Sequence, residues 1–90
     1  MYSIDIKNSF KKDYKLALKR GLDEDKLEEA LKLLRKDGKL PAKYKPHVLK
    51  GRYKGLWECH IQSDWLLIWD QQDTIRLITL IRTGTHSDLF

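Results

Sequence analysis

The sequence contains a single cysteine, Cys59, and no long apolar segment. One cysteine excludes an internal disulfide and a zinc site made of several cysteines. The longest uninterrupted apolar run, Trp65–Trp69, is far shorter than the roughly 20 residues that a membrane-spanning helix needs. The residues after Met1 contain no apolar segment of the secretory type. These absences favour a globular protein of the reducing cytoplasm, without a membrane partner.

Acidic residues are missing from one long segment of the chain. No Asp or Glu occurs between Gly38 and Trp57, where the cations are Lys39, Lys43, Lys45, Lys50, Arg52 and Lys54. The whole chain has 18 Lys and Arg against 13 Asp and Glu, a net charge of +5. Such an excess favours an anionic partner, either a nucleic acid or an acidic protein.

The chain length of 90 residues allows one domain, residues 1–90, and not two independent cores. Residues 2–6 alternate between apolar and polar types, which predicts a strand. From Asn8 the apolar residues instead recur at helical spacing. We predict Asn8 or Ser9 as the N-cap of this helix and Gly21 as its end.

A second helix is predicted between Asp25 and Gly38, where apolar side chains again recur on one face. Asp25 and Glu28 have the spacing of a capping box, and Gly38 suits the end. Because the turn between the helices is short, we expect an antiparallel helical hairpin. Residues 39–55 hold two prolines and two glycines without a sustained period, which predicts a long and therefore functional loop.

Three strands are predicted after this loop. Residues 56–61 alternate between two faces, residues 65–69 are apolar throughout as in a central strand, and residues 74–82 are rich in β-branched side chains. Polar turns at 62–64 and 70–73 join the strands as hairpins. The order β-α-α-β-β-β indicates an α+β fold, in which the helical hairpin packs on a mostly antiparallel four-stranded sheet.

The three histidines, His47, His60 and His86, lie in different parts of the chain, each near basic or aromatic residues. A single histidine is most often a surface residue, but an imidazole can give or take a proton at neutral pH. Metal-free cleavage of RNA needs a base for the 2′-hydroxyl and an acid for the leaving 5′-oxygen. The histidines are therefore candidate catalytic residues that we expect to converge in one concave patch. The sequence leaves open which is the acid and which the base.

Further residues complete a candidate RNA site. Arg82 stays protonated and has planar donors that suit a charged phosphate in the transition state. Asp64 lies at the same predicted turn as His60 and is expected to orient a histidine or to act as a base. The tryptophans fit the core, and Trp65 is the one placed to reach the site. The remaining candidate RNA contacts are Phe90, by stacking on a base, and Lys50, Arg52 and Lys54, along the phosphates.

A metal site is the competing use of three histidines. Zinc ligands usually stand in closely spaced pairs, as in the His-Glu-x-x-His motif. No such motif or pair occurs, so we expect neither a metal nor another cofactor.

Three segments resemble one known family. The segments LPAKYKPHVLKG (40–51), YKGLWECHIQSDWLLIW (53–69) and RTGTHSDLF (82–90) are similar to the YafQ-type toxins of the RelE/ParE superfamily, the toxin halves of bacterial type II toxin–antitoxin pairs. The likeness is strong over residues 40–90. Over the two predicted helices it is looser and lies mainly in the sequence pattern. It places the functional positions of the family on His47, His60, Asp64, Trp65, Arg82, His86 and Phe90.

The resemblance implies a RelE-like fold and an mRNA interferase, an endoribonuclease that enters the ribosomal A site and cuts translated mRNA without a metal. It also implies a cognate antitoxin that covers the active cleft, and a toxin–antitoxin complex that binds operator DNA. Two residues depart from the pattern. Ser63 stands where related sequences often have proline, and Phe90 replaces a catalytic tyrosine of the RelE branch, so the mechanism must rest on the histidines.

Two other functions fit part of this pattern. A ParE-type toxin would have the same fold but bind DNA gyrase, and its histidines would be dispensable. A non-catalytic RNA-binding module would keep its affinity after each His→Ala change and lose it, in a salt-dependent way, when Lys50 or Arg52 is replaced. No motif indicates the codon preference, the need for the ribosome or the stoichiometry with an antitoxin.

Overall fold

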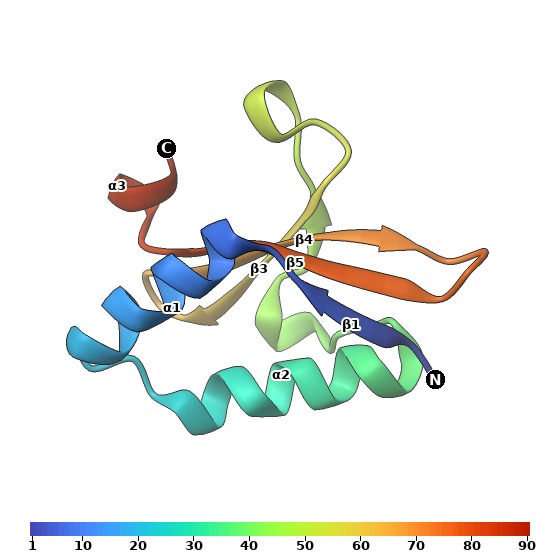
Figure 1. The fold of residues 1–90 in the computed structure, drawn as a ribbon, viewed down its shortest axis with the longest axis horizontal. Coiled ribbons are helices and arrows are strands. Elements are labelled where there is room, and N and C mark those ends of the chain that lie inside the picture. Colours follow the sequence, from blue (N-terminus) through green and yellow to red (C-terminus); the bar gives the residue numbers. More distant parts are fainter.

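In the computed structural model, which describes residues 1–90, two long helices cover one side of a five-stranded sheet (Figure 1). A short C-terminal helix and a projecting loop rise on the other side (Figure 1). The elements in chain order are β1 (Ser3–Ile6), α1 (Asn8–Lys19), α2 (Glu24–Asp37), the 3-10 helix η1 (Ala42–Tyr44), β2 (His47–Val48), the 3-10 helix η2 (Gly51–Tyr53), β3 (Trp57–Gln62), β4 (Trp65–Gln72), β5 (Leu77–Gly84) and α3 (His86–Leu89).

The strands lie in the order β1-β5-β4-β3-β2. Strand β1 pairs with β5 in parallel, and the other pairs are antiparallel. The α+β fold predicted from the sequence is confirmed, with one strand more than expected. Strand β2 lies inside the segment predicted to be a loop, and its two residues, paired with Glu58 and Trp57, are too few to show an alternating pattern.

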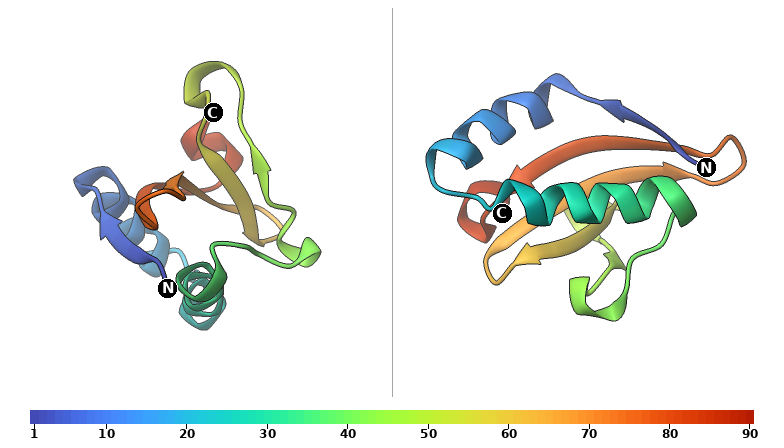
Figure 2. Two further views of the ribbon diagram at one scale, coloured as in Figure 1. Left: turned by 90° about the vertical axis from the view of Figure 1, so that its right-hand side faces the viewer. Right: turned by 90° about the horizontal axis from the view of Figure 1, so that it is seen from below.

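Strand β4 is buried on both faces, as its unbroken apolar run predicts. Leu67 and Trp69 face the main core under α1 and α2, together with Leu34 and Leu80. The other face of β4 joins a smaller cluster of Leu66, Ile68 and Leu89. The helix α2 runs across the sheet, and the chain end lies on the opposite side (Figure 2). The two faces therefore serve different purposes: one holds the core, and the other carries the chemistry-bearing residues described below.

The helix starts differ from the prediction. Helix α1 has Lys7 as its N-cap residue, without a side-chain cap. The Ser9 hydroxyl instead donates to the Ile81 carbonyl at 2.6 Å and ties α1 to β5. Asp23, and not Asp25, caps α2, because its carboxylate accepts from the Asp25 backbone N–H. At α1, the predicted cap residue Ser9 makes a tertiary hydrogen bond instead of capping the helix. At α2, Asp23 takes the capping role predicted for Asp25.

The last two strands are shifted relative to the prediction. Strand β4 continues to Gln72, so the turn expected at 70–73 lies at 73–76, and β5 extends to Gly84. Gln71 pairs with Ile78 of β5, and its side-chain amide donates to the Gly38 carbonyl at 2.8 Å. The four residues of α3 were not predicted; Thr85 and Asp88 form its capping box. No helix of this chain has the length and apolar character needed to cross a membrane.

Gly38 ends α2 in the left-handed conformation, with φ of 68°. A Cβ atom at this position would lie 2.5 Å from the Tyr2 ring. We expect Gly38→Ala to lower the free energy of unfolding by about 1 kcal/mol or more, measured by urea denaturation. Gly21→Ala is the control, since Gly21 also has a positive φ but a Cβ atom there would meet nothing within 4 Å. An equal loss in both variants would show that the Tyr2 contact is unimportant.

Candidate active site

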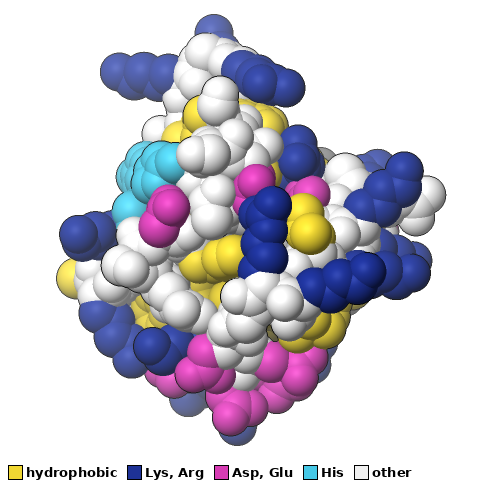
Figure 3. Space-filling model, turned by 90° about the vertical axis from the view of Figure 1, so that its left-hand side faces the viewer, with side chains coloured by type: hydrophobic (Ala, Val, Ile, Leu, Met, Phe, Trp, Pro, Cys, Tyr) yellow, Lys and Arg dark blue, Asp and Glu magenta, His cyan; other side chains and the backbone are white.

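The candidate site lies on the sheet face opposite α1 and α2, beside α3. His60, in β3, and His86, at the start of α3, have their ring centroids 5.9 Å apart. Figure 3 shows histidine side chains gathered on one part of this surface, beside an acidic side chain. The sheet thus brings together two of the three histidines, although 26 positions separate them in the sequence.

His86 is held by Asp64, the residue at the turn between β3 and β4. The Asp64 carboxylate accepts from the His86 backbone N–H at 3.1 Å and contacts the ring Nδ1 at 2.9 Å. A carboxylate can only accept at this contact, so Nδ1 carries the proton and Nε2 remains available for other chemistry. The same hydrogen bonds hold the pKa of Asp64 below its ordinary value, so Asp64 is ionised at neutral pH.

His47, in β2, lies opposite Glu58 of β3 in the strand pairing. Its Nε2 lies 3.1 Å from the Glu58 Oε1, and its Nδ1 lies 2.9 Å from the Lys45 carbonyl oxygen. Both ring nitrogens are therefore engaged, which does not suit a group that must exchange a proton with substrate. Glu58 is buried, and its Oε2 has no hydrogen-bond partner. Sequence reasoning missed Glu58, and only its position on the same strand face as His60 could have indicated it.

Arg82, in β5, is paired with Asp13 of α1. Its Nε donates to Asp13 at 2.6 Å and its Nη2 at 3.2 Å, and the Thr83 backbone N–H donates to the same carboxylate. Asp13 raises the pKa of Arg82 above its ordinary value. Asp13 was not predicted, although it is the single acid within the basic helix α1 and that isolation was a visible signal.

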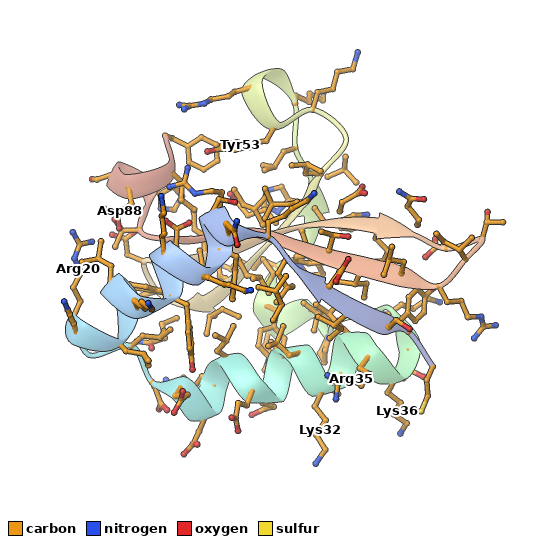
Figure 4. All side chains as sticks on the ribbon, viewed as in Figure 1. Arg20, Lys32, Arg35, Lys36, Tyr53 and Asp88 are labelled. Carbon is orange, nitrogen blue, oxygen red and sulfur yellow. The ribbon has the colours of Figure 1, made fainter.

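Phe90 extends the site beyond α3. Phe90 as a whole residue is 57% exposed, and its ring lies 6.3 Å from the His86 ring, centroid to centroid. Tyr53 reaches from the η2 loop toward α3, as Figure 4 shows, and its ring meets Phe90 edge to face at 5.3 Å. The Tyr53 hydroxyl donates to the Leu89 carbonyl at 2.9 Å. Tyr53 is a third residue that sequence reasoning did not identify.

Trp65 does not have the exposure that its predicted RNA contact needs. It is only 7% exposed, and its Nε1 donates to the Thr83 hydroxyl at 3.0 Å within the helix-covered core. The β4 register points its side chain to the face that α1 and α2 cover, where it packs in the main core. By contrast, the cations Lys50, Arg52 and Lys54 are exposed on the projecting η2 loop.

The arrangement can support proton transfer on a bound anion. It offers two neighbouring imidazoles and an ionised carboxylate that orients one of them. His, Cys, Asp and Glu side chains form no group of three or more that could hold a metal ion. The two histidines lie beside Phe90, which contacts Tyr53 of the basic η2 loop.

Comparisons with known proteins give one consistent result. The family described as "Bacterial toxin of type II toxin-antitoxin system, YafQ" matches residues 2–90. A curated relative from Escherichia coli (strain K12), named mRNA interferase toxin YafQ, is 42% identical over 88 residues, which are 97% of this chain and 94% of that protein.

Solved structures of similar proteins have the same fold. YafQ from E. coli strain BL21(DE3) has a TM-score of 0.90 at 40% identity, covering 100% of this chain and 99% of that one. YafQ in the E. coli DinJ–YafQ complex has a TM-score of 0.89 at 41% identity, with coverage of 100% and 99%. A metal-bound toxin from Helicobacter pylori has a TM-score of 0.89 at 37% identity, with both chains covered to 100%.

Proposed function

Since this chain belongs to the YafQ family of bacterial toxins of type II toxin–antitoxin systems, we propose that it is an mRNA interferase that cuts translated mRNA in the ribosomal A site by histidine acid–base catalysis. The observation that carries this proposal is the His86–Asp64 pair, with a Nδ1–Oδ1 distance of 2.9 Å, beside the His60 ring. It combines an oriented imidazole with a second imidazole within reach of the same phosphodiester.

The proposed reaction is attack of the 2′-oxygen on the adjacent phosphorus. His60 takes the proton of the 2′-hydroxyl while the bond from the 2′-oxygen to phosphorus forms. His86 starts this step as the imidazolium, protonated at both ring nitrogens, and gives its Nε2 proton to the 5′-oxygen while the bond from phosphorus to that oxygen breaks; its Nδ1–H stays on Asp64. The products are a 2′,3′-cyclic phosphate and a 5′-hydroxyl, so all atoms and protons balance. The engaged nitrogens of His47 favour His60 as the base.

Asp64 and Arg82 support this reaction in different ways. Asp64 fixes the His86 tautomer and stabilises the imidazolium, as the aspartate of a catalytic triad does. Arg82 has five N–H donors, of which those on Nε and Nη2 contact Asp13. The Tyr53 hydroxyl lies near the guanidinium and adds to the rise in its pKa. The donors that do not contact Asp13 can stabilise the charge that develops on the phosphate.

The same family membership supports a proposal about partners. The E. coli relative is described in complex with DinJ. We infer that this chain likewise binds a cognate antitoxin, that the complex binds its operator DNA, and that the free toxin acts in the cytoplasm on the ribosome and its mRNA. The exposed cations Lys50, Arg52 and Lys54 supply the positive surface that RNA phosphates require.

Mapping of mRNA 5′ ends after brief expression tests the proposed activity. Cuts in translated messages, in the reading frame and absent from untranslated RNA, are the expected result. Damage at replication without mRNA cuts would instead identify a ParE-type gyrase toxin. RNA binding without any new 5′ ends would identify a non-catalytic module.

Asp64→Asn tests the orienting role of the carboxylate. The amide can donate to Nδ1 and so stabilise the wrong tautomer of His86, and we expect cleavage to slow by about 10-fold or more. Because the folded pKa of Asp64 is lowered, its contact with His86 is present at neutral pH and lost only as the pH falls through that lowered value. The control is Asp73→Asn, in the hairpin between β4 and β5, where Asp73 accepts from Tyr2. Equal rates for the two variants would contradict an orienting role.

A further inference from the structure

A line of aromatic groups continues from the candidate active site onto the η2 loop. The ring centroids are 5.9 Å apart between His60 and His86, 6.3 Å between His86 and Phe90, and 5.3 Å between Phe90 and Tyr53. The Arg52 guanidinium carbon lies 5.6 Å from the Tyr53 ring centroid and ends the line. Tyr53 and Arg52 take no part in the proton transfers proposed above.

Phe90 is exposed, yet its place is fixed. Its backbone N–H donates to the His86 carbonyl at 2.8 Å, and the Tyr53 ring supports its ring edge to face. Tyr53 is in turn anchored by its hydroxyl on the Leu89 carbonyl. An exposed terminal aromatic ring that is held from two sides presents a flat apolar surface next to His86, without the entropy cost of ordering it on binding.

The position of Tyr53 differs from that of a simple core residue. Its ring is half-buried against the smaller cluster of Leu66, Ile68 and Leu89, and the Arg52 guanidinium covers its ring. Arg52 itself is exposed and has no carboxylate partner. A guanidinium plane that is free of an ion pair can stack on a nucleobase as well as bind phosphate.

We propose that Tyr53 and Arg52 extend the stacking surface expected of Phe90 into a nucleobase-binding subsite for the nucleotide that flanks the cleaved phosphodiester. This inference rests on the proposed function, because it requires a single-stranded message in the site. A base stacks on Phe90 or on the Arg52 plane, since every base has an aromatic face and single-stranded RNA is commonly held in this way. Tyr53 is a positioning residue that holds both groups in place.

Ribosomes programmed with a short message test the subsite under single-turnover conditions. The message carries either its ordinary A-site codon or one abasic nucleotide, at each of the three codon positions in turn. With the ordinary codon, we expect Tyr53→Ala to slow cleavage roughly 5- to 100-fold, the effect of one lost base–aromatic stack. With the abasic nucleotide at the flanking position, the wild type slows similarly and Tyr53→Ala causes little further loss.

Two further variants separate stacking from other roles. Arg52→Lys keeps the positive charge but removes the planar guanidinium. If Arg52 stacks on a base, this variant should show part of the slower cleavage seen with Tyr53→Ala. If Arg52 only attracts phosphate, cleavage should not slow. Tyr2→Ala, at a half-buried tyrosine beside α2, is the control for a general loss of stability.

A loss in Tyr53→Ala that is equal on ordinary and abasic messages at every position would overturn the subsite, because it would reveal a purely structural role. Unchanged cleavage by Tyr53→Ala would overturn it as well. In both of these results the wild-type protein still cleaves the ordinary message. If the wild type cleaves no message at all, the proposed function itself is refuted.

Discussion

His86→Ala is expected to lower in-frame cleavage of translated mRNA by roughly 100- to 10,000-fold, the range that general acid catalysis contributes. The change removes the imidazole that the Asp64 carboxylate orients at Nδ1, and the proposed reaction gives no other group the task of protonating the leaving 5′-oxygen. Asp64 cannot replace it, because its lowered pKa keeps that carboxyl ionised at neutral pH. The measurement is the single-turnover rate on programmed ribosomes, together with arrest of growth on expression.

The fold should survive this change. The His86 side chain is exposed, and α3 keeps its capping box of Thr85 and Asp88. Circular dichroism and thermal unfolding establish that the variant is folded. His47→Ala is the matched control, since its ring is held by Glu58 and Lys45 and we expect a much smaller loss. Full activity of a folded His86→Ala protein would rule out the mechanism.

Arg82→Ala is expected to slow cleavage by about 100- to 1,000-fold, the cost of removing one preorganised donor group from a transition state. It also leaves Asp13, a partly buried carboxylate, without its guanidinium, although the Thr83 N–H still donates to it. Some loss of stability should therefore accompany the loss of rate. The first is measured by urea denaturation and the second by single-turnover cleavage.

Two variants separate these effects. Arg82→Lys retains the charge but has no planar fork, so it cannot contact Asp13 and the phosphate at the same time, and we expect most of the rate to be lost. Asp13→Asn removes the charge that neutralises Arg82 while leaving the guanidinium in the site. If Arg82→Ala cuts as fast as the wild type at a temperature where both are folded, Arg82 serves only to join α1 to the sheet.

Much of the fold could be predicted from local patterns. Helical spacing gave α1 and α2, the unbroken apolar run gave the doubly covered β4, and Gly38 marked the end of α2. These predictions held because each depends on neighbours two to four residues away, where the backbone period alone decides which side chains share a face. Strand β2 and helix α3 were missed because two or four residues show no period.

The sequence by itself determined which chemical groups this protein has: the imidazoles of His47, His60 and His86, the Asp64 carboxylate, the Arg82 guanidinium and the Phe90 ring. Only the tertiary structure decided how they pair. Asp64 is hydrogen-bonded to His86 and not to His60, its neighbour in the sequence, while His47 is taken by Glu58 and Arg82 by Asp13.

The physical reason is strand register. Register shifts between His60 and Gln62, and between Ile68 and Trp69, change which residues oppose one another. No local pattern marks them, because a bulge is set by the packing of whole strands. The same packing points the Trp65 side chain into the core under α1 and α2. The candidate site lies on the opposite face of the sheet.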